Sequence, residues 1–159
     1  MVAPDTASSV QPTAGHGTVT VVETGHGLAQ TLFDGRHSLV ADEPVASGGN
    51  DTGPDPYELL LMALGACTSA TLRLYARLKQ WPLERVSVEL RHTRNHVGDC
   101  LNCTEKTVRL DHIDRVIQLD GPLDPEQTAR LLAIANRCPV HQSLTAGFEI
   151  ATRLGPLAG

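Results

Sequence analysis

Residues 53–68 have the sequence GPDPYELLLMALGACT, and this stretch decides the fold. Asp55 can be the N-cap of a helix, Pro56 its first residue and Glu58 the N3 residue that completes a capping box. Residues 59–66 are apolar nearly all round, so we expect the opening turns to be buried on most sides. Spacing of three and four predicts one buried helix face, made of Leu60, Leu64, Cys67, Thr71, Leu74 and Leu78.

Short β-branched runs precede this helix. They occupy residues 18–22, 29–33 and 38–41, and the breaks between them contain Gly25, Gly27 and Gly35. Glycine-bearing breaks of this length are typical of hairpin turns, so the pattern predicts an antiparallel meander. The polar, glycine-rich residues 47–54 are then expected to form a loop.

The part after the helix alternates between strand and helix signals. The helix is expected to end at Gln80-Trp81-Pro82. A strand is predicted at 86–90, with further alternation at 107–110 and 116–119 on either side of polar stretches.

A second helix is predicted from the N-cap Asp124 through Pro125 and Gln127 to about Arg137. Because a proline cannot continue a helix without a kink, Cys138-Pro139 is expected to start a new one. Phe148, Ile150 and Thr152 alternate as in a last strand. The order β-β-β-α-β-β-α-β predicts an α+β fold in a single domain, residues 16–159, after a disordered tail at 1–15.

Composition narrows the class of protein. The chain has 159 residues, of which 41% are hydrophobic and 19% charged, an ordinary balance for one globular domain. The net charge of -5 argues against nucleic-acid and anionic membrane partners. The longest apolar run, 59–64, is far shorter than the roughly 20 residues that span a bilayer. Residues 1–15 lack a secretory pattern, so we expect a cytoplasmic protein whose important thiols are catalytic, redox-active or metal-binding.

Cys67 lies in a stretch of small residues within the first predicted helix. Gly65 costs a helix about 1 kcal/mol relative to alanine, so another element is expected to approach this face closely. Judged by its surroundings alone, Cys67 is a core thiol, because burial among apolar groups raises a thiol pKa.

Cys138 differs because it lies at a predicted helix start. Unpaired N–H groups and the positive end of the helix dipole stabilise a thiolate there, and His141 can add charge or a hydrogen bond. The alternative is that Cys138 only fills the turn between two helices.

Cys100 and Cys103 form a CxxC in a polar segment. Such a pair can supply two of the four ligands of a structural zinc, with His92, His96 or Asp99 contributing, or it can be a redox pair or an incidental one. One CxxC is weak support for metal, so the sequence assigns no metal and no cofactor.

Residues 53–68, the preceding Asp42-Glu43-Pro44 and the box Cys138-Pro139-Val140-His141 together resemble OsmC-like proteins, the relatives of the osmotically inducible protein C and the organic hydroperoxide resistance proteins. The resemblance covers about residues 16–154. It implies antiparallel sheets packed around long helices in an intertwined homodimer, with active sites at the subunit interface.

The resemblance also implies an activity. Cys67 would be the peroxidatic thiol that reduces an organic hydroperoxide, Cys138 the resolving thiol, and Glu58 a further site residue. A dithiol such as a lipoylated protein would be the reductant. The peroxidases of this family carry Asn-Pro-Glu at the helix start and an arginine that holds the thiolate. Here the carboxylate comes one position later, and Arg36 is the only arginine before the helix. The alternative is an OsmC-like protein that binds a small ligand or serves a stress response without strong peroxidase activity.

Overall fold

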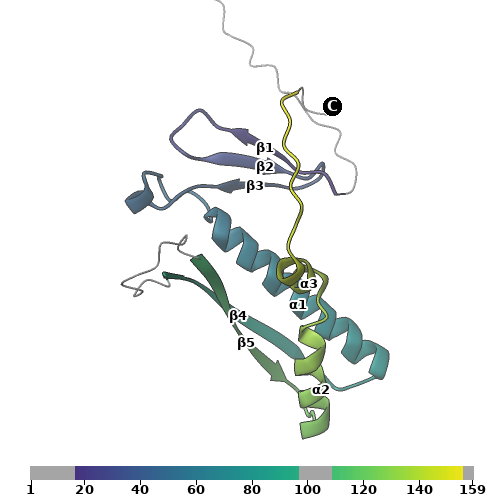
Figure 1. The fold of residues 1–159 in the computed structure, drawn as a ribbon. Helices are drawn as coiled ribbons and strands as arrows, with labels where there is room; N and C mark the ends of the chain where they lie inside the picture. The colour runs from purple at the N-terminus through teal and green to yellow at the C-terminus, as the bar shows by residue number, and fades with distance from the viewer. Residues whose placement is uncertain (1–16, 97–108, 156–159) are drawn as a thin grey trace, which may run out of the picture. The chain divides into compact units, whose positions relative to one another are not determined.

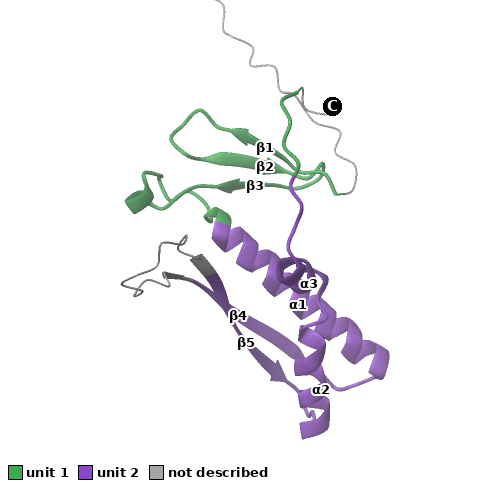
Figure 2. Cartoon of the chain, viewed as in Figure 1, with its two compact units in different colours: residues 1–56, 151–159 green, residues 57–150 purple. Residues whose placement is uncertain are grey.

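The computed structural model describes residues 17–96 and 109–155. It comprises two compact units: unit 1 is residues 1–56 with 151–159, and unit 2 is residues 57–150 (Figures 1 and 2). The tail predicted at 1–15 and the CxxC at 100–103 lie outside the described residues.

Unit 1 contains the predicted meander. Its strands are β1 (Thr20–Glu23), β2 (Gln30–Phe33) and β3 (Ser38–Ala41), antiparallel in the order β1-β2-β3. The turn between β2 and β3 is organised by Asp34, whose carboxylate accepts the backbone N–H groups of Arg36 and His37 at 2.9 and 2.6 Å. Gly35 has φ +92° there, a conformation that costs other residues energy.

A buried carboxylate organises the loop after β3. Asp42 accepts the N–H groups of Glu43 and Asn50, and Thr52 donates both its N–H and its hydroxyl to the same Oδ2. The short 3-10 helix η1 (Val45–Ser47) lies within this loop. The sequence predicted a loop here, and the carboxylate gives it a defined structure.

Helix α1 (Pro56–Lys79) begins at Pro56, as predicted. Its buried residues follow one another at intervals of four: Leu64, Thr68, Leu72 and Ala76. The predicted face is wrong in the second half of the helix, where Leu74 and Leu78 are 65% and 78% exposed. Spacing of three and four fits several overlapping stripes, and packing inside unit 2 selects a different one. The expected all-round burial of the opening turns is also wrong within this chain, because Met62 is exposed.

By length and composition alone, α1 can cross a membrane: it has 24 residues and a window of mean hydropathy 1.4. Inside unit 2, however, Leu72 and Ala76 of this helix belong to the hydrophobic core, with Leu131 and Ile134. Part of the apolar surface of α1 is therefore buried on protein within unit 2.

The strands β4 (Arg85–His96) and β5 (Arg109–Asp120) form an antiparallel pair, in register from Arg85 opposite Asp120 to His96 opposite Arg109. The predicted order, with two strands between the first two helices, is confirmed. Both strands are longer than their patterns of alternation indicated, because the polar positions also pair across the strands. His92 Nε2 and Asp111 Oδ1, for example, lie 3.0 Å apart.

Two helices follow the strand pair. Helix α2 (Pro125–Ala135) has the predicted capping box, in which Asp124 accepts the N–H of Gln127 at 2.7 Å and its own N–H donates to the Gln127 side chain at 3.2 Å. Helix α3 (Pro139–Ala146) begins after the N-cap Cys138, also as predicted. The α2 residues Leu131, Ile134 and Ala135 complete the core of unit 2.

The last predicted strand is wrong. Residues 147–155 have no regular secondary structure, and Phe148 and Ile150 are exposed. A strand needs a neighbour for its backbone groups. In the described part of this chain, neither sheet includes this segment as a strand.

Candidate functional site

Unit 2 brings the two predicted thiols together. Cys67 lies in the middle of α1 and is partly buried, and Cys138 is the fully buried N-cap of α3. Both are free thiols, and their side chains lie within hydrogen-bonding reach of each other. The meeting depends on the turn between α2 and α3, which presents Cys138 to α1.

The surroundings of Cys67 disfavour its thiolate. Burial raises the pKa of this thiol, and the adjacent Cys138 sulfur raises it further through a hydrogen bond and through charge. The Val140 N–H and the Thr71 hydroxyl oppose the increase without cancelling it. These surroundings therefore favour the protonated form of the Cys67 thiol.

The surroundings of Cys138 favour its thiolate. Burial raises the pKa of this thiol, but polar contacts from Cys67, from the N–H of His141 and from the Thr68 hydroxyl outweigh burial, so the pKa lies below its usual value. Cys138 makes no regular side-chain capping hydrogen bond. The open N–H groups at the start of α3 still act on the sulfur, as they do on anions at helix N-termini.

An arginine that the sequence analysis did not single out lies beside the pair. Arg115 of β5 donates from Nη1 to the Thr68 hydroxyl oxygen at 3.0 Å and to the Ala135 carbonyl at 3.3 Å, and from Nη2 to Asn136 Oδ1 at 2.7 Å. A signal was present in the sequence. Arg115 alternates with Ile113 and Ile117, so it is a cation in an otherwise apolar strand face.

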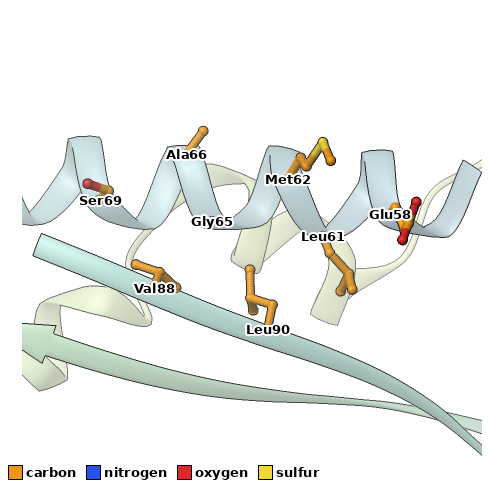
Figure 3. Close-up of a pocket in the computed structure, with 8 residues that line it drawn as sticks. All are labelled: Glu58, Leu61, Met62, Gly65, Ala66, Ser69, Val88 and Leu90. Carbon is orange, nitrogen blue, oxygen red and sulfur yellow. The ribbon is translucent and has the colours of Figure 1, made fainter. Parts of the chain in front are cut away.

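Glu58 lies in the first turn of α1, away from the thiols along the helix. It lines a cavity of about 540 Å³ between α1 and β4, together with Leu61, Met62, Gly65, Ala66, Ser69, Val88 and Leu90 (Figure 3). Among the described residues, neither cysteine lines this cavity. The structure thus brings Cys67 and Cys138 together but places Glu58 at a different cavity of the same chain.

Gly65 lies on the face of α1 that is turned to Leu90 of β4 in this cavity wall (Figure 3). A Cβ atom at this position would lie 3.0 Å from Cδ1 of Leu90. This confirms the prediction that another element approaches the helix closely at this glycine.

A second cavity, of about 280 Å³, opens on the thiol side of α1. Its wall includes Leu64 of α1, Arg115 of β5 and His141 of α3, with Asp111, Ile113, Leu144 and Thr145. Leu64 precedes Cys67 by one helical turn, and His141 follows Cys138 by one turn. The cavity is therefore lined by apolar side chains and by charged groups of both signs, Arg115 and Asp111, and lies near the thiols without being lined by them.

A metal site is not visible in the part of the chain that the structure describes, which contains no group of three or more metal-ligating side chains. Cys100 and Cys103 lie outside that part. Their three alternatives, a zinc site, a redox pair and an incidental pair, stay predictions.

Comparison with known proteins identifies a family and similar structures for this chain. A family model described as OsmC-like protein matches residues 48–153. No curated protein matches the chain. Similar solved structures include a Psychrobacter arcticus protein of the osmotic stress and detoxification response (19% identity, TM-score 0.65, 80% of this chain and 88% of that one).

Two further structures have the same fold at similarly low identity. An OsmC-like protein from Mycoplasma pneumoniae is 20% identical, with a TM-score of 0.63, and the match covers 80% of this chain and 86% of that one. An organic hydroperoxide resistance protein from Legionella pneumophila is 21% identical, with a TM-score of 0.58, and the match covers 79% and 85%. The family match over most of the chain and the shared fold lead to one conclusion: this protein belongs to the OsmC-like family.

Proposed function

We propose that this protein reduces organic hydroperoxides with the thiol pair Cys67 and Cys138. The observation that carries the proposal is their proximity: two cysteines far apart in sequence lie within hydrogen-bonding reach in unit 2. Membership of the OsmC-like family supports it, because similar structures include proteins described as organic hydroperoxide resistance proteins.

In the first step, Cys67 attacks the peroxide. It is the more accessible of the two sulfurs, since Cys138 is fully buried. The proton of Cys67 passes to the Cys138 thiolate, and the Cys67 sulfur then donates an electron pair to one peroxide oxygen. The O–O bond breaks, Cys67 becomes a sulfenic acid, and the departing alkoxide takes the proton from Cys138 to form the alcohol.

In the second step, Cys138 resolves the sulfenic acid. The Cys138 thiolate attacks the Cys67 sulfur, an S–S bond forms, and the hydroxide that leaves takes a proton from solvent to become water. The polar contacts that lower the pKa of Cys138 support this role, because the thiolate is the attacking form. An external dithiol, such as a lipoylated protein, then reduces the Cys67–Cys138 disulfide by thiol–disulfide exchange: it gives up two electrons and two protons, leaves as a disulfide, and returns both cysteines as thiols.

We further propose that two copies form a homodimer and that Glu58 serves the site from the partner copy. Met62, Leu74 and Leu78 leave apolar surface on α1 exposed in the single chain. Glu58 lies on a cavity that neither thiol of its own chain lines among the described residues. Light scattering gives the molar mass in solution. Mixed dimers of Glu58→Gln and Cys67→Ser chains, in which one site keeps both groups, test the exchange: restored activity supports it, and inactive mixtures contradict it.

The activity test is intact mass spectrometry and stopped-flow mixing with one equivalent of an alkyl hydroperoxide. We expect loss of one thiol pair much faster than free cysteine reacts, with a sulfenic acid on Cys67 trapped in Cys138→Ser and no reaction in Cys67→Ser. Cys100→Ser/Cys103→Ser is the matched control and should react like wild type. Survival of both thiols in wild type would overturn the proposal.

A second candidate function is the binding of a small apolar ligand. The 540 Å³ cavity at Glu58 favours it, because its volume is within the range of ligand pockets and most of its lining is apolar. The raised pKa of Cys67 also favours it, since a protonated thiol is a poor nucleophile. Native mass spectrometry of the purified protein would support binding by revealing a bound apolar molecule, together with hydroperoxide reduction near the background rate.

A further inference from the structure

The Arg115 side chain connects three elements of unit 2. From β5 it reaches the Thr68 hydroxyl on α1 and the last carbonyl of α2, at Ala135, while its second terminal nitrogen holds the side chain of Asn136. A cation at the C-terminal end of a helix is favourable because carbonyl groups there lack partners. Cys138 follows Asn136 by two residues, so Arg115 holds the turn that carries the buried thiol.

The contact with Thr68 fixes the direction of a hydroxyl group. A guanidinium can only donate, so the Thr68 oxygen must accept from Arg115, and the hydroxyl hydrogen is left for another partner. Thr68 is fully buried, so bulk water does not compete for its hydroxyl hydrogen. The Cys138 sulfur lies within reach of that hydroxyl and is fully buried as well.

We propose that Arg115 is a positioning residue that acts through Thr68: by donating to the Thr68 oxygen it leaves the hydroxyl hydrogen to point towards the buried Cys138 sulfur. The proposal rests on the two-thiol function given above and deepens it. In this proposal the cation at the thiol site is Arg115 of β5, and it acts on Cys138 through Thr68.

The neighbouring Thr71 provides the contrast. It lies one turn further along α1 and its hydroxyl acts on Cys67 instead. The two threonines thus serve different sulfurs from the same helix. The titratable or charged groups on this side of unit 2 include Cys67 on α1, Asp111 and Arg115 on β5, and His141 on α3, whose backbone N–H also acts on the Cys138 sulfur.

The consequence for the cycle concerns its second step. If Cys138 is already deprotonated when the sulfenic acid forms on Cys67, the disulfide closes before a second peroxide can oxidise Cys67 to the sulfinic acid. Loss of the Thr68 hydroxyl should therefore slow disulfide formation and increase overoxidation of the Cys67 that has reacted with peroxide.

The test compares Thr68→Val, Thr68→Ser, Thr71→Val, Arg115→Gln and Asn136→Ala, all with Cys100→Ser and Cys103→Ser so that the thiol signal comes from the pair. The thiolate of each cysteine is followed against pH by ultraviolet absorbance and by site-resolved alkylation with iodoacetamide, detected by mass spectrometry. Circular dichroism establishes that each variant is folded.

In Thr68→Val and Arg115→Gln we expect the thiolate population of Cys138 at neutral pH to fall about ten-fold, the ratio that one hydrogen bond to a charged group supports. Thr68→Ser keeps the hydroxyl and should titrate like the parent. Thr71→Val should change the titration of Cys67 first. Asn136→Ala removes a contact that holds the turn and should leave the Cys138 titration in place.

Folded Thr68→Val with an unchanged Cys138 titration would overturn the proposal. An equal effect of Asn136→Ala would overturn it too, since it would show that Arg115 acts only by holding the turn. Failure of the peroxidase function gives a different pattern: hydroperoxide leaves the thiols intact, yet the Thr68→Val titration still moves, which supports the positioning role.

Discussion

The side chains of Cys67 and Cys138 lie within hydrogen-bonding reach of each other, one partly buried on α1 and the other fully buried at the start of α3. Contacts across the core of unit 2 produce this pairing, since the cysteines come from opposite ends of its sequence. A bond between the two sulfurs would tie α1 to α3 and close a long loop.

Oxidation should therefore stabilise the protein. A disulfide that closes a long loop typically adds about 2–4 kcal/mol to the free energy of unfolding, because it restricts the unfolded chain. Urea titrations of diamide-oxidised and dithiothreitol-reduced protein measure the difference. Cys138→Ser is the matched control and should show no gain on oxidation. Equal midpoints for oxidised and reduced wild type would show that the two thiols do not join.

Leu131→Ala should destabilise unit 2 strongly. The side chain is fully buried in the core with Leu72 and Ala76, and removal of such a leucine costs about 2–5 kcal/mol through lost burial and a cavity. Chemical denaturation measures the cost. The adjacent Leu132 is 59% exposed, so Leu132→Ala should stay within about 0.5 kcal/mol of wild type. Similar losses of stability in both variants would show that the buried face of α2 is assigned incorrectly.

Asp124→Ala should weaken the start of α2 by about 1 kcal/mol. The substitution removes the acceptor for the Gln127 N–H and with it one half of the capping box. Thermal unfolding followed by circular dichroism measures the change, and Asp124→Ser, which keeps an N-cap acceptor, should recover most of it. If serine behaves like alanine, the carboxylate is not acting as a cap.

Asp42 should make the stability of unit 1 depend on pH. The hydroxyl of Thr52 and the surrounding N–H groups hold the pKa of the buried carboxyl below its usual value, despite the opposing effect of burial. A carboxyl whose folded pKa is lowered stabilises the fold at pH values above its unfolded pKa, about 3.9, and this contribution disappears as the pH falls through the folded pKa.

The check is a comparison of Asp42→Asn with wild type by hydrogen exchange of residues 43–52 across that pH range. We expect weaker protection in the variant at neutral pH and convergence with wild type in acid. Thr52→Val, which removes only the hydroxyl contact, should give a smaller effect in the same direction. A difference that grows as the pH falls would contradict the assignment.

Local chemistry in the sequence was enough for several features. The start of α1 follows from a proline, the start of α2 from a cap and a proline, and the close approach at Gly65 from the cost of glycine in a helix. The cysteine boxes made the candidate site predictable only through the family resemblance, because nothing local to Cys67 indicates that Cys138 is near.

Features that depend on distant partners were missed. The full length of β5 requires pairing with β4, and the failed last strand lacks such pairing among the described residues. The stripe of α1 that is buried depends on which elements pack on it. Arg115 illustrates the same limit: its place in an apolar strand face was visible, but its contacts with Thr68 and Asn136 arise only when three elements meet.

The arrangement of Thr68 and Thr71 on α1 has a consequence for divergence within this fold. Each hydroxyl acts on a different sulfur, so the preference of the pair for one thiolate depends on two side chains that are not themselves cysteines. Single substitutions at either threonine can then change which thiol is more readily deprotonated, while both cysteines are retained.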